Sequence, residues 1–215
     1  MIKNRTVQLM FQTAFSTLGI LGIIASFGTF NYEFRTDFYV HFTNLSNYLC
    51  IGIMFIELAE TVKKNKNQYV TKLPLLKFIG LLAILLTFII FNFILAGDRE
   101  VYLNFRINSV LFHIVLPIMY LIDWILFYEH KKIKWYYPLI SVVFPVVYAI
   151  FIFIRAWILD FNPNAPYIYP YFFLNLDELG VVGVTKWICI LSLVFIIIGY
   201  TIFGLDKILI KKKSK

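Results

Sequence analysis

Threonine, asparagine and histidine side chains inside apolar stretches are the residues of this sequence that could do chemistry. The segment His41 to Asn47 reads HFTNLSN at the start of one apolar run, and His113 lies within another. A bilayer penalises such groups unless they pair or perform a task. A threonine hydroxyl becomes a nucleophile when a neutral histidine within hydrogen-bond reach accepts its proton. The chemistry that Thr43 and His113 permit together is therefore nucleophilic catalysis.

The positions of these residues along their helices place them at a similar depth. Thr43 and His113 each lie about five residues inside an apolar run that starts on the same side, which is roughly 8 Å at 1.5 Å per residue. Asn92 and Arg155 reach the same layer from runs of the opposite direction. We therefore expect a cluster near the outer leaflet that contains Thr43, Asn47, Asn92, His113 and Arg155.

Each further member of this cluster has a chemical role to offer. Asn47 or Asn92 could donate hydrogen bonds to a developing oxyanion, and Arg155 could hold a carboxylate or a phosphate headgroup. Residues 162–173 carry three prolines and five aromatic residues. We expect this segment to lie flat on the outer interface as a lid over the helices, with Tyr169 and Tyr171 among the substrate-binding residues.

A structural reading of the same residues stands beside the catalytic one. Threonine and asparagine in membrane helices commonly bond to backbone or to a neighbouring helix, and a lone buried histidine is commonly a structural donor. Three histidines without paired spacing provide no metal-ligand set. The phosphate-binding, nucleophile-elbow, zinc-protease and CxxC motifs do not occur. We therefore expect no metal and no cofactor.

Composition and hydropathy indicate an integral membrane protein. Of the 215 residues, 60% are hydrophobic, and the mean hydropathy is +0.79. A helix of about 20 apolar residues crosses a bilayer, and the sequence contains six runs of about that length. We predict an all-α, polytopic membrane protein, a six-transmembrane-helix bundle forming a single domain over residues 1–215. The predicted spans are about 7–30, 38–60, 74–96, 108–128, 135–157 and 182–204.

The distribution of the net charge of +8 indicates topology and argues against nucleic-acid binding. Assigning loops alternately to two sides places 15 of the 20 lysines and arginines on the side of both termini. The positive-inside rule then predicts a multi-pass protein of the cell membrane with both termini cytoplasmic. The basic C-terminal residues 211–215 suit contact with anionic membrane lipid. The charges lie in short separate loops, so we expect no nucleic-acid partner.

Several local features predict where helices begin, bend and pair. Asp37 is a candidate N-cap for the second span, and Pro74 suits the first turn of the third. Pro117 is expected to kink its helix or to free a carbonyl. Glu57 and Glu60 are expected to pair with Lys63 or Lys64 at the inner interface. Cys50 and Cys189 both lie in apolar runs, which favours packing over a disulfide.

Four motifs carry a resemblance to a known family. They are FTNLSN at residues 42–47, HIVLP at 113–117 with Asp123-Trp124, Tyr137-Pro138 with Tyr148, and YPYF at 169–172. In this order and spacing the chain resembles the bacterial six-helix membrane proteins called the Pr6Pr family, over nearly its whole length. It is also distantly similar to the animal androgen-induced and androgen-dependent membrane proteins, which are threonine hydrolases of fatty-acid esters of hydroxy fatty acids. On that pattern Thr43 is the nucleophile and His113 the base.

The leading hypothesis from the sequence is therefore a lipid or acyl-ester hydrolase with an intramembrane Thr43–His113 site. The alternative is a non-enzymatic binder or transporter of a small amphiphile, for which helix breaks at Pro117 and Pro145 are suited. A third reading is a structural or regulatory partner of another membrane protein. The oligomeric state stays open.

Overall fold

The computed structural model describes residues 4–29, 34, 37–64, 71–94, 107–130, 132–160 and 168–211. Within these residues it is all-α, and six helices are long and apolar enough to cross a membrane. These candidate spans are Arg5–Ser26, Phe42–Lys63, Pro74–Phe93, Ile107–Phe127, Tyr137–Asp160 and Leu176–Leu209. The prediction of an all-α chain with six spans is confirmed, and the long apolar runs explain why: each is about one bilayer thickness long.

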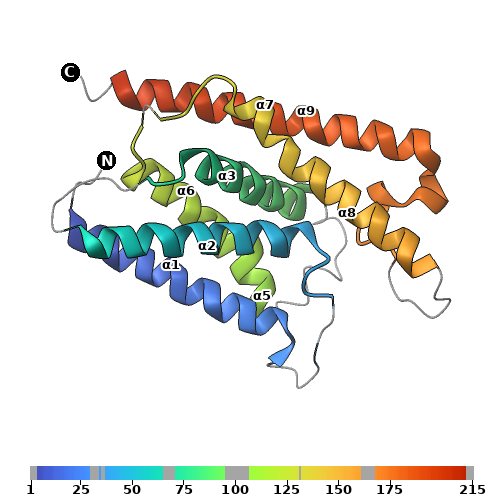
Figure 1. Cartoon of the computed structure of the whole chain (residues 1–215), viewed down its shortest axis with the longest axis horizontal. Helices are drawn as coiled ribbons and strands as arrows, with labels where there is room; N and C mark the ends of the chain where they lie inside the picture. Colours follow the sequence, from blue (N-terminus) through green and yellow to red (C-terminus); the bar gives the residue numbers. More distant parts are fainter. Residues whose placement is uncertain are drawn as a thin grey trace. The chain divides into compact units, whose positions relative to one another are not determined.

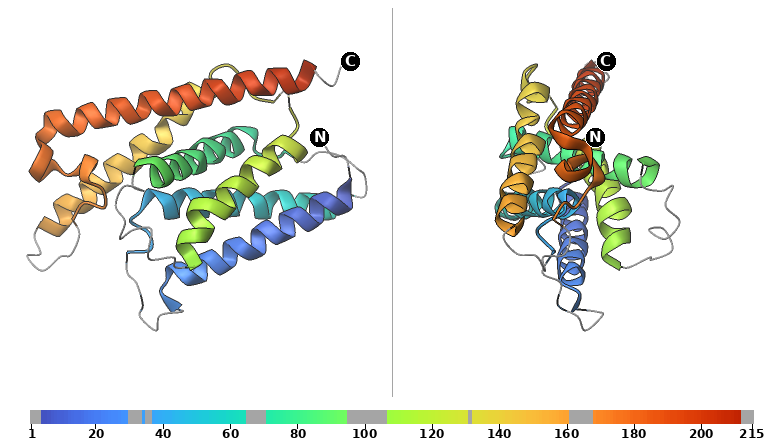
Figure 2. Two further views of the ribbon diagram at one scale, coloured as in Figure 1. Left: turned by 180° about the vertical axis from the view of Figure 1, so that it is seen from behind. Right: turned by 90° about the vertical axis from the view of Figure 1, so that its right-hand side faces the viewer.

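The chain divides into two compact units. The first unit comprises Met1–Lys134 and Asp206–Lys215, and the second comprises Trp135–Leu205. The first unit contains α1 (Arg5–Ser26), α2 (Phe42–Lys63), α3 (Pro74–Ile89) and α6 (Leu116–Phe127). Figure 1 shows α1 and α2 side by side, and the rear view in Figure 2 shows α6 passing along α1 and α3. The site residues predicted on the first four spans thus come from four packed helices.

The helix starts in this unit follow from side-chain capping and proline. The Asn4 side chain accepts hydrogen bonds from the backbone N–H groups of Thr6 and Val7 and so caps α1. Pro74 occupies the first turn of α3, as predicted. The prediction that Asp37 caps the second span is wrong, because α2 begins only at Phe42 and its N-cap residue makes no side-chain cap bond. A turn over residues 37–40 precedes the helix instead.

Two π-helical segments interrupt the third and fourth spans. The segment η2 (Ile90–Ile94) ends the third span, and η4 (Leu111–Val115) joins α5 (Ile107–Val110) to α6. In η4 the N–H of Leu116 bonds to the carbonyl of Leu111, five residues back, instead of Phe112, four residues back. Pro117 follows directly and lacks the N–H that the His113 carbonyl would accept in an α-helix. The π-turn and the proline therefore leave the carbonyls of Phe112 and His113 without the N–H donors, four residues further on, that a regular α-helix supplies.

Close packing of α1 on η4 depends on Gly22. A Cβ atom at this position would lie 2.3 Å from Cε1 of Phe112, whose side chain is buried among its neighbours. We expect Gly22→Ala to lower the free energy of unfolding by about 1–3 kcal/mol through overpacking. Gly52→Ala is the matched control, because its Cβ would meet no atom within 4 Å. Equal thermal unfolding midpoints of the two variants in detergent micelles would contradict this account of the contact.

The second unit contains α7 (Tyr137–Ser141), α8 (Val143–Asp160), η5 (Phe172–Leu174) and the part of α9 (Leu176–Lys211) up to Leu205. The fifth span is interrupted at Val142, three residues before Pro145, because a proline cannot donate to the preceding turn. Asn175 caps α9 by accepting from the N–H of Asp177 at 3.0 Å. Gly180 (φ 61°) bends α9 near its start, a backbone conformation that favours glycine.

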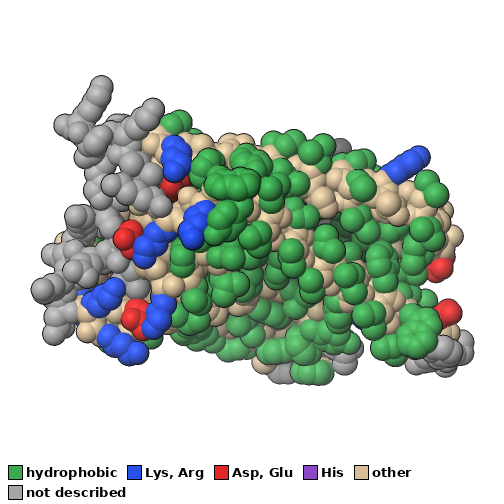
Figure 3. Space-filling model, turned by 45° about the horizontal axis from the view of Figure 1, so that its top comes forward, with side chains coloured by type: hydrophobic (Ala, Val, Ile, Leu, Met, Phe, Trp, Pro, Cys, Tyr) green, Lys and Arg blue, Asp and Glu red, His purple; other side chains and the backbone are tan. Residues whose placement is uncertain are grey.

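The surface is apolar to a degree that water-soluble proteins avoid. Large hydrophobic side chains are exposed along the candidate spans of both units, among them Met10 (68% exposed), Ile118 (43%) and Val181 (72%). In Figure 3, hydrophobic side chains cover the middle of the face drawn, and the charged side chains lie towards its two ends, most of them at the left. Such surfaces mark contact with lipid or with other proteins, and together with the six helices they indicate a multi-pass membrane protein.

Candidate functional site

The start of α2 is tied to η4 by one side chain, that of Asn47. Its amide nitrogen donates to the carbonyl of Thr43 at 2.8 Å and to the carbonyl of Phe112 at 3.0 Å. Phe112 directly precedes His113. The structure thus brings together the helix segments that carry the two predicted catalytic residues. This also shows that α2 and the fourth span touch, which the sequence could not establish.

The ring of His113 is held in one orientation. Its Nδ1 lies 2.9 Å from the carbonyl oxygen of Ser109 and therefore donates its hydrogen to that oxygen. In the neutral ring this leaves the lone pair of Nε2 as the acceptor. The imidazole stacks on Phe91 with ring centroids 3.6 Å apart and an interplanar angle of 15°. A fixed tautomer and a fixed ring plane are what a general base requires.

The asparagine amides stabilise the interrupted helix. Asn47 donates to Phe112 O, the carbonyl that the π-turn leaves without a helical donor. Asn92 donates to Phe88 O at 2.8 Å and to His113 O at 3.3 Å, and the latter is the carbonyl that Pro117 leaves without a donor. Both N–H bonds of each amide are therefore used on backbone carbonyls, so the geometry does not support the predicted oxyanion role of Asn47 or Asn92.

This assignment of Asn92 makes a prediction about stability. Asn92→Leu removes the side-chain donor to His113 O and is expected to cost about 1–3 kcal/mol, the penalty for an unsatisfied buried polar group. Pro117→Ala restores a backbone N–H four residues after that carbonyl, so the double variant should lose less than the sum of the two single variants. The measurement is a double-mutant cycle of unfolding free energies in mixed micelles. Strictly additive energies would show that Asn92 and Pro117 do not act on the same carbonyl.

Thr43 and His113 lie on helix segments that Asn47 joins, without a direct bond between the two residues. Within the described part of the chain, no hydrogen bond joins the Thr43 hydroxyl to His113. The Thr43 carbonyl accepts from Ser46 Oγ at 3.0 Å as well as from Asn47, and Ser46 Oγ in turn lies 3.0 Å from Thr87 Oγ1. The backbone of Thr43 is therefore fixed by two side chains, and the residue is half-buried. Catalytic hydrogen bonds often tighten only when substrate is bound.

Arg155 and Tyr169 lie in the second unit. Arg155 Nη1 donates to the carbonyl of Ile168 at 2.8 Å and so anchors the start of residues 168–173, the described part of the aromatic segment, to α8. Desolvation raises the pKa of the Tyr169 phenol, and the carboxylates of Asp177 and Asp160 raise it further. The phenol is therefore protonated at neutral pH and able to donate a hydrogen bond.

Tyr171 belongs to an aromatic group that packs on α9. Its ring stacks on Phe173 with centroids 5.0 Å apart, and it contacts Tyr148 of α8 at 6.4 Å. Phe172 and Phe173 both contact Trp187. The motifs containing Tyr148 and Tyr171, far apart in the sequence, thus meet in one layer. Residues 162–167, the first part of the predicted lid, lie outside the described residues.

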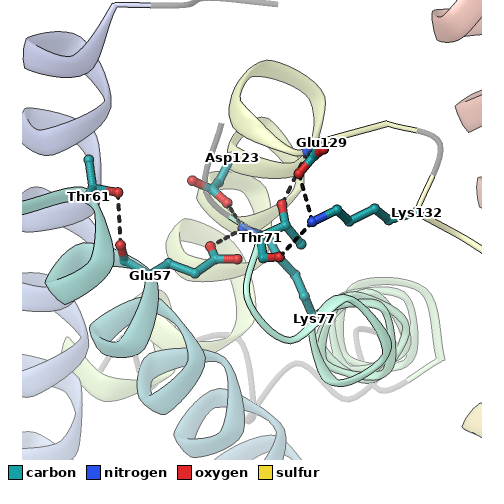
Figure 4. Close-up of polar contacts among 7 residues, drawn as sticks. All are labelled: Glu57, Thr61, Thr71, Lys77, Asp123, Glu129 and Lys132. Atoms are coloured by element: carbon teal, nitrogen blue, oxygen red, sulfur yellow. Dashed lines mark hydrogen bonds and ion pairs between the residues drawn. The ribbon is translucent and has the colours of Figure 1, made fainter. Parts of the chain in front are cut away.

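A buried ionic cluster in the first unit was not predicted. Figure 4 shows Lys77 of α3 between Glu57 of α2 and Asp123 of α6. The Lys77 ammonium forms an ion pair with Glu57 Oε2 and another with Asp123 Oδ2. The side chains of Glu57 and Lys77 are 1% exposed and that of Asp123 is 0% exposed. Ionisable groups buried inside a membrane domain are a functional-site hypothesis by default.

The predicted pairing of Glu57 with Lys63 or Lys64 is wrong, because Glu57 pairs with Lys77. Glu60 does pair with Lys63, at 3.7 Å, and also with Lys72, at 2.8 Å. The sequence contained a usable signal: Lys77 interrupts an apolar run three residues after Pro74. A helix buries the side of such a run that faces its neighbours, so a lysine there can point inward and needs acidic partners at the same depth.

Residues at the charged end of the first unit form a second network. Thr71 Oγ1 accepts from the N–H of Glu129 at 3.2 Å, and Lys132 donates to Thr71 O at 3.2 Å while pairing with Glu129 at 2.7 Å (Figure 4). These contacts join the start of the third span to the end of the fourth. Among the described residues, no group of three or more His, Cys, Asp and Glu side chains is arranged to hold a metal ion.

No protein-family model matches the chain, and no curated protein or solved structure matches it. The assignment of function therefore depends on the residues and contacts described above.

Proposed function

We propose that the protein is a membrane-embedded hydrolase of lipid or acyl esters, with Thr43 as nucleophile and His113 as general base. The observation that carries the proposal is the double hydrogen bond of Asn47 to Thr43 O and Phe112 O. It places the hydroxyl-bearing end of α2 against the π-helical turn that carries His113. π-Helical turns occur frequently at functional sites.

The mechanism follows from the geometry of the two helix segments. The Thr43 hydroxyl attacks the ester carbonyl as its proton passes to Nε2 of His113, and the same proton then leaves with the alcohol. Water, deprotonated by His113, hydrolyses the acyl-threonine and regenerates the hydroxyl. Thr43 lies in the first turn of α2. The positive end of the helix dipole in this turn favours the negative charge of the oxyanion, in place of Asn47 and Asn92.

The resemblance to the Pr6Pr family and to the animal threonine hydrolases supports the same pair of residues. It suggests a substrate with a long acyl chain, such as a fatty-acid ester of a hydroxy fatty acid, which would reach the site sideways from the bilayer. We place the protein in the cell membrane with both termini in the cytoplasm, following the distribution of lysine and arginine among the loops. Thr43 and His113 then lie near the outer leaflet.

The experiment that tests this function is hydrolysis of a panel of acyl esters by the purified protein in lipid nanodiscs. We expect turnover by the wild type and its loss in Thr43→Ala and in His113→Ala. Full activity in both variants would exclude these residues as the catalytic pair. A wild type that turns over no ester of any chain length would exclude the hydrolase.

A second candidate function is the binding or transport of a small amphiphile. The observation that favours it is the run of buried polar side chains through the first unit. The ionic cluster of Lys77 lies towards one end, the Ser46–Thr87 pair further along, and Asn47 at the far end. Transporters place polar groups in this way along a substrate path. Flux of a labelled amphiphile into liposomes that persists in Thr43→Ala would favour this candidate over the hydrolase.

A further inference from the structure

The charges of the buried cluster do not balance when all three groups are ionised. Glu57 and Asp123 contribute two negative charges, and Lys77 contributes one positive charge. Burial of an uncompensated charge costs several kcal/mol. A proton bound by one of the two carboxyl groups removes this cost and makes the cluster neutral.

Each carboxyl group has an oxygen available for that proton. Lys77 contacts Oε2 of Glu57 and Oδ2 of Asp123. The other two oxygens, Glu57 Oε1 and Asp123 Oδ1, are buried and have no hydrogen-bond partner within the described chain. Buried polar atoms without a hydrogen-bond partner are rare in native proteins, and those that occur usually have a specific cause. Protonation of either oxygen turns an uncompensated acceptor into a neutral acid.

Buried glutamines of α1 lead from this cluster towards the charged end of the unit. Phe11 contacts Phe127 and Phe15 contacts Tyr120, so Gln12, between them on α1, lies at the level of Asp123 on α6. Gln12 is fully buried, and neither its amide nitrogen nor its oxygen has a hydrogen-bond partner among the described residues.

Gln8, one turn earlier on α1, is also buried, and its amide nitrogen has no partner in the described chain. One turn before Gln8, Arg5 donates to the carbonyls of Thr61 and Val62 at the end of α2. Polar side chains of this kind are the sites that internal water occupies. Together with Gln12 they outline a polar route to the end of the unit that carries Lys63 and Lys72.

Among the described residues, Tyr120 and Cys50 are titratable groups next to the cluster. Tyr120 lies beside Lys77, with the ammonium 5.7 Å from its ring centroid, and Cys50 donates to Gly80 O at 3.3 Å. Further away, three pairs of described groups bond to each other: Glu60 with Lys72, Glu129 with Lys132, and His130 Nδ1 with Asp206 Oδ1 at 2.6 Å. Tyr128 contacts Trp124 and His130. None of these contacts supplies the missing positive charge to the cluster.

We infer that Glu57, Lys77 and Asp123 form a proton-binding site that holds one exchangeable proton shared by the two carboxyl groups. The site is separate from Thr43 and His113 and exchanges with water through Gln12 and Gln8. When the proton leaves for water, the cluster carries one net negative charge, and it returns to neutrality when a proton comes back by the same route. Such a site is the chemical unit of proton relays in membrane proteins.

The test is infrared spectroscopy of the full-length protein in lipid nanodiscs at neutral pH. The wild type should show the carbonyl stretch of a protonated carboxylic acid, and this band should shift after transfer to D₂O. Glu57→Gln and Asp123→Asn should each remove it, because one carboxylate then balances Lys77. Lys77→Met should roughly double it, because both carboxyl groups then need a proton. Glu60→Gln, in an exposed ion pair, is the control that should change nothing.

The wild-type spectrum alone decides the inference if a variant fails to fold. A spectrum without a protonated carboxyl band would overturn it, and so would a band that persists unchanged in both Glu57→Gln and Asp123→Asn. A band that does not shift in D₂O would exclude exchange with water. None of these outcomes bears on ester hydrolysis, so the two proposals succeed or fail separately.

Discussion

Replacement of Lys77 by methionine is expected to destabilise the protein by about 3–5 kcal/mol, the range found when one partner of a buried ion pair is removed. The Lys77 ammonium contacts a carboxylate from each of two neighbouring helices, and all three side chains are buried. Methionine fills a similar volume but leaves two acidic groups in an apolar interior. The measurement is equilibrium unfolding in mixed micelles, followed by circular dichroism.

Two further variants separate the charge from the packing. Lys72→Met breaks an ion pair that is exposed to solvent, so we expect a much smaller change. The triple variant Glu57→Gln/Lys77→Met/Asp123→Asn buries no charge and should regain much of the lost stability. If Lys77→Met is as stable as the wild type, the cluster does not hold α2, α3 and α6 together through its charges.

His113→Ala is expected to lower kcat/KM for ester hydrolysis by roughly 10²–10⁴-fold, the usual contribution of a general base. Thr43→Ala should lower it to the background rate, because the acyl-threonine can no longer form. Catalytic residues that act as a unit give non-additive losses, so the double variant should be no slower than Thr43→Ala. Thr43→Ser keeps a hydroxyl and should retain measurable turnover.

The control for these variants is Thr201→Ala. Thr201 lies on α9, and its hydroxyl donates to Ile197 O at 2.8 Å within the same helix. Its removal should leave kcat/KM unchanged, whereas a comparable loss in Thr201→Ala would mean that any threonine substitution disturbs the fold. Losses in Thr43→Ala and His113→Ala that multiply in the double variant would show that the two residues act independently.

The spans of this protein could be predicted because they depend on one property, the length of each apolar run. The predicted and observed limits of the third span agree closely at its start, where Pro74 fixes the first turn. The start of the second span was placed at residue 38, four residues too early, because hydropathy does not distinguish the turn over residues 37–40 from a helix. The last helix begins six residues earlier than predicted because Asn175 caps a short first turn before Gly180.

The candidate site could be predicted only in part. Depth along each helix brought Thr43, Asn47, Asn92 and His113 into one layer, and the contacts of the two asparagines join these segments. Depth does not show in which direction around the helix axis a side chain points. The π-turn of η4 changes that direction for His113 relative to a regular helix. The use of both amides on backbone carbonyls follows from that turn and from Pro117, so the oxyanion role assigned to them from residue type was not supported.

The ionic cluster was missed because its lysine was counted as a topological signal. Lys77 lies near the side to which the positive-inside rule assigns most lysines, and there it was interpreted as a loop or interface residue. The same argument from depth that paired Thr43 with His113 would have paired Lys77 with Glu57 and Asp123. An ionisable residue within an apolar run should therefore be checked for a buried partner before its charge is used to assign topology.

The most direct test of the catalytic site is covalent labelling of the purified protein with a long-chain alkyl fluorophosphonate, followed by peptide mass spectrometry. We expect one adduct, on Thr43, that forms slowly or not at all in His113→Ala, because the base is needed to activate the hydroxyl. An adduct on another residue would contradict this account, as would the absence of any adduct in a wild type that hydrolyses esters.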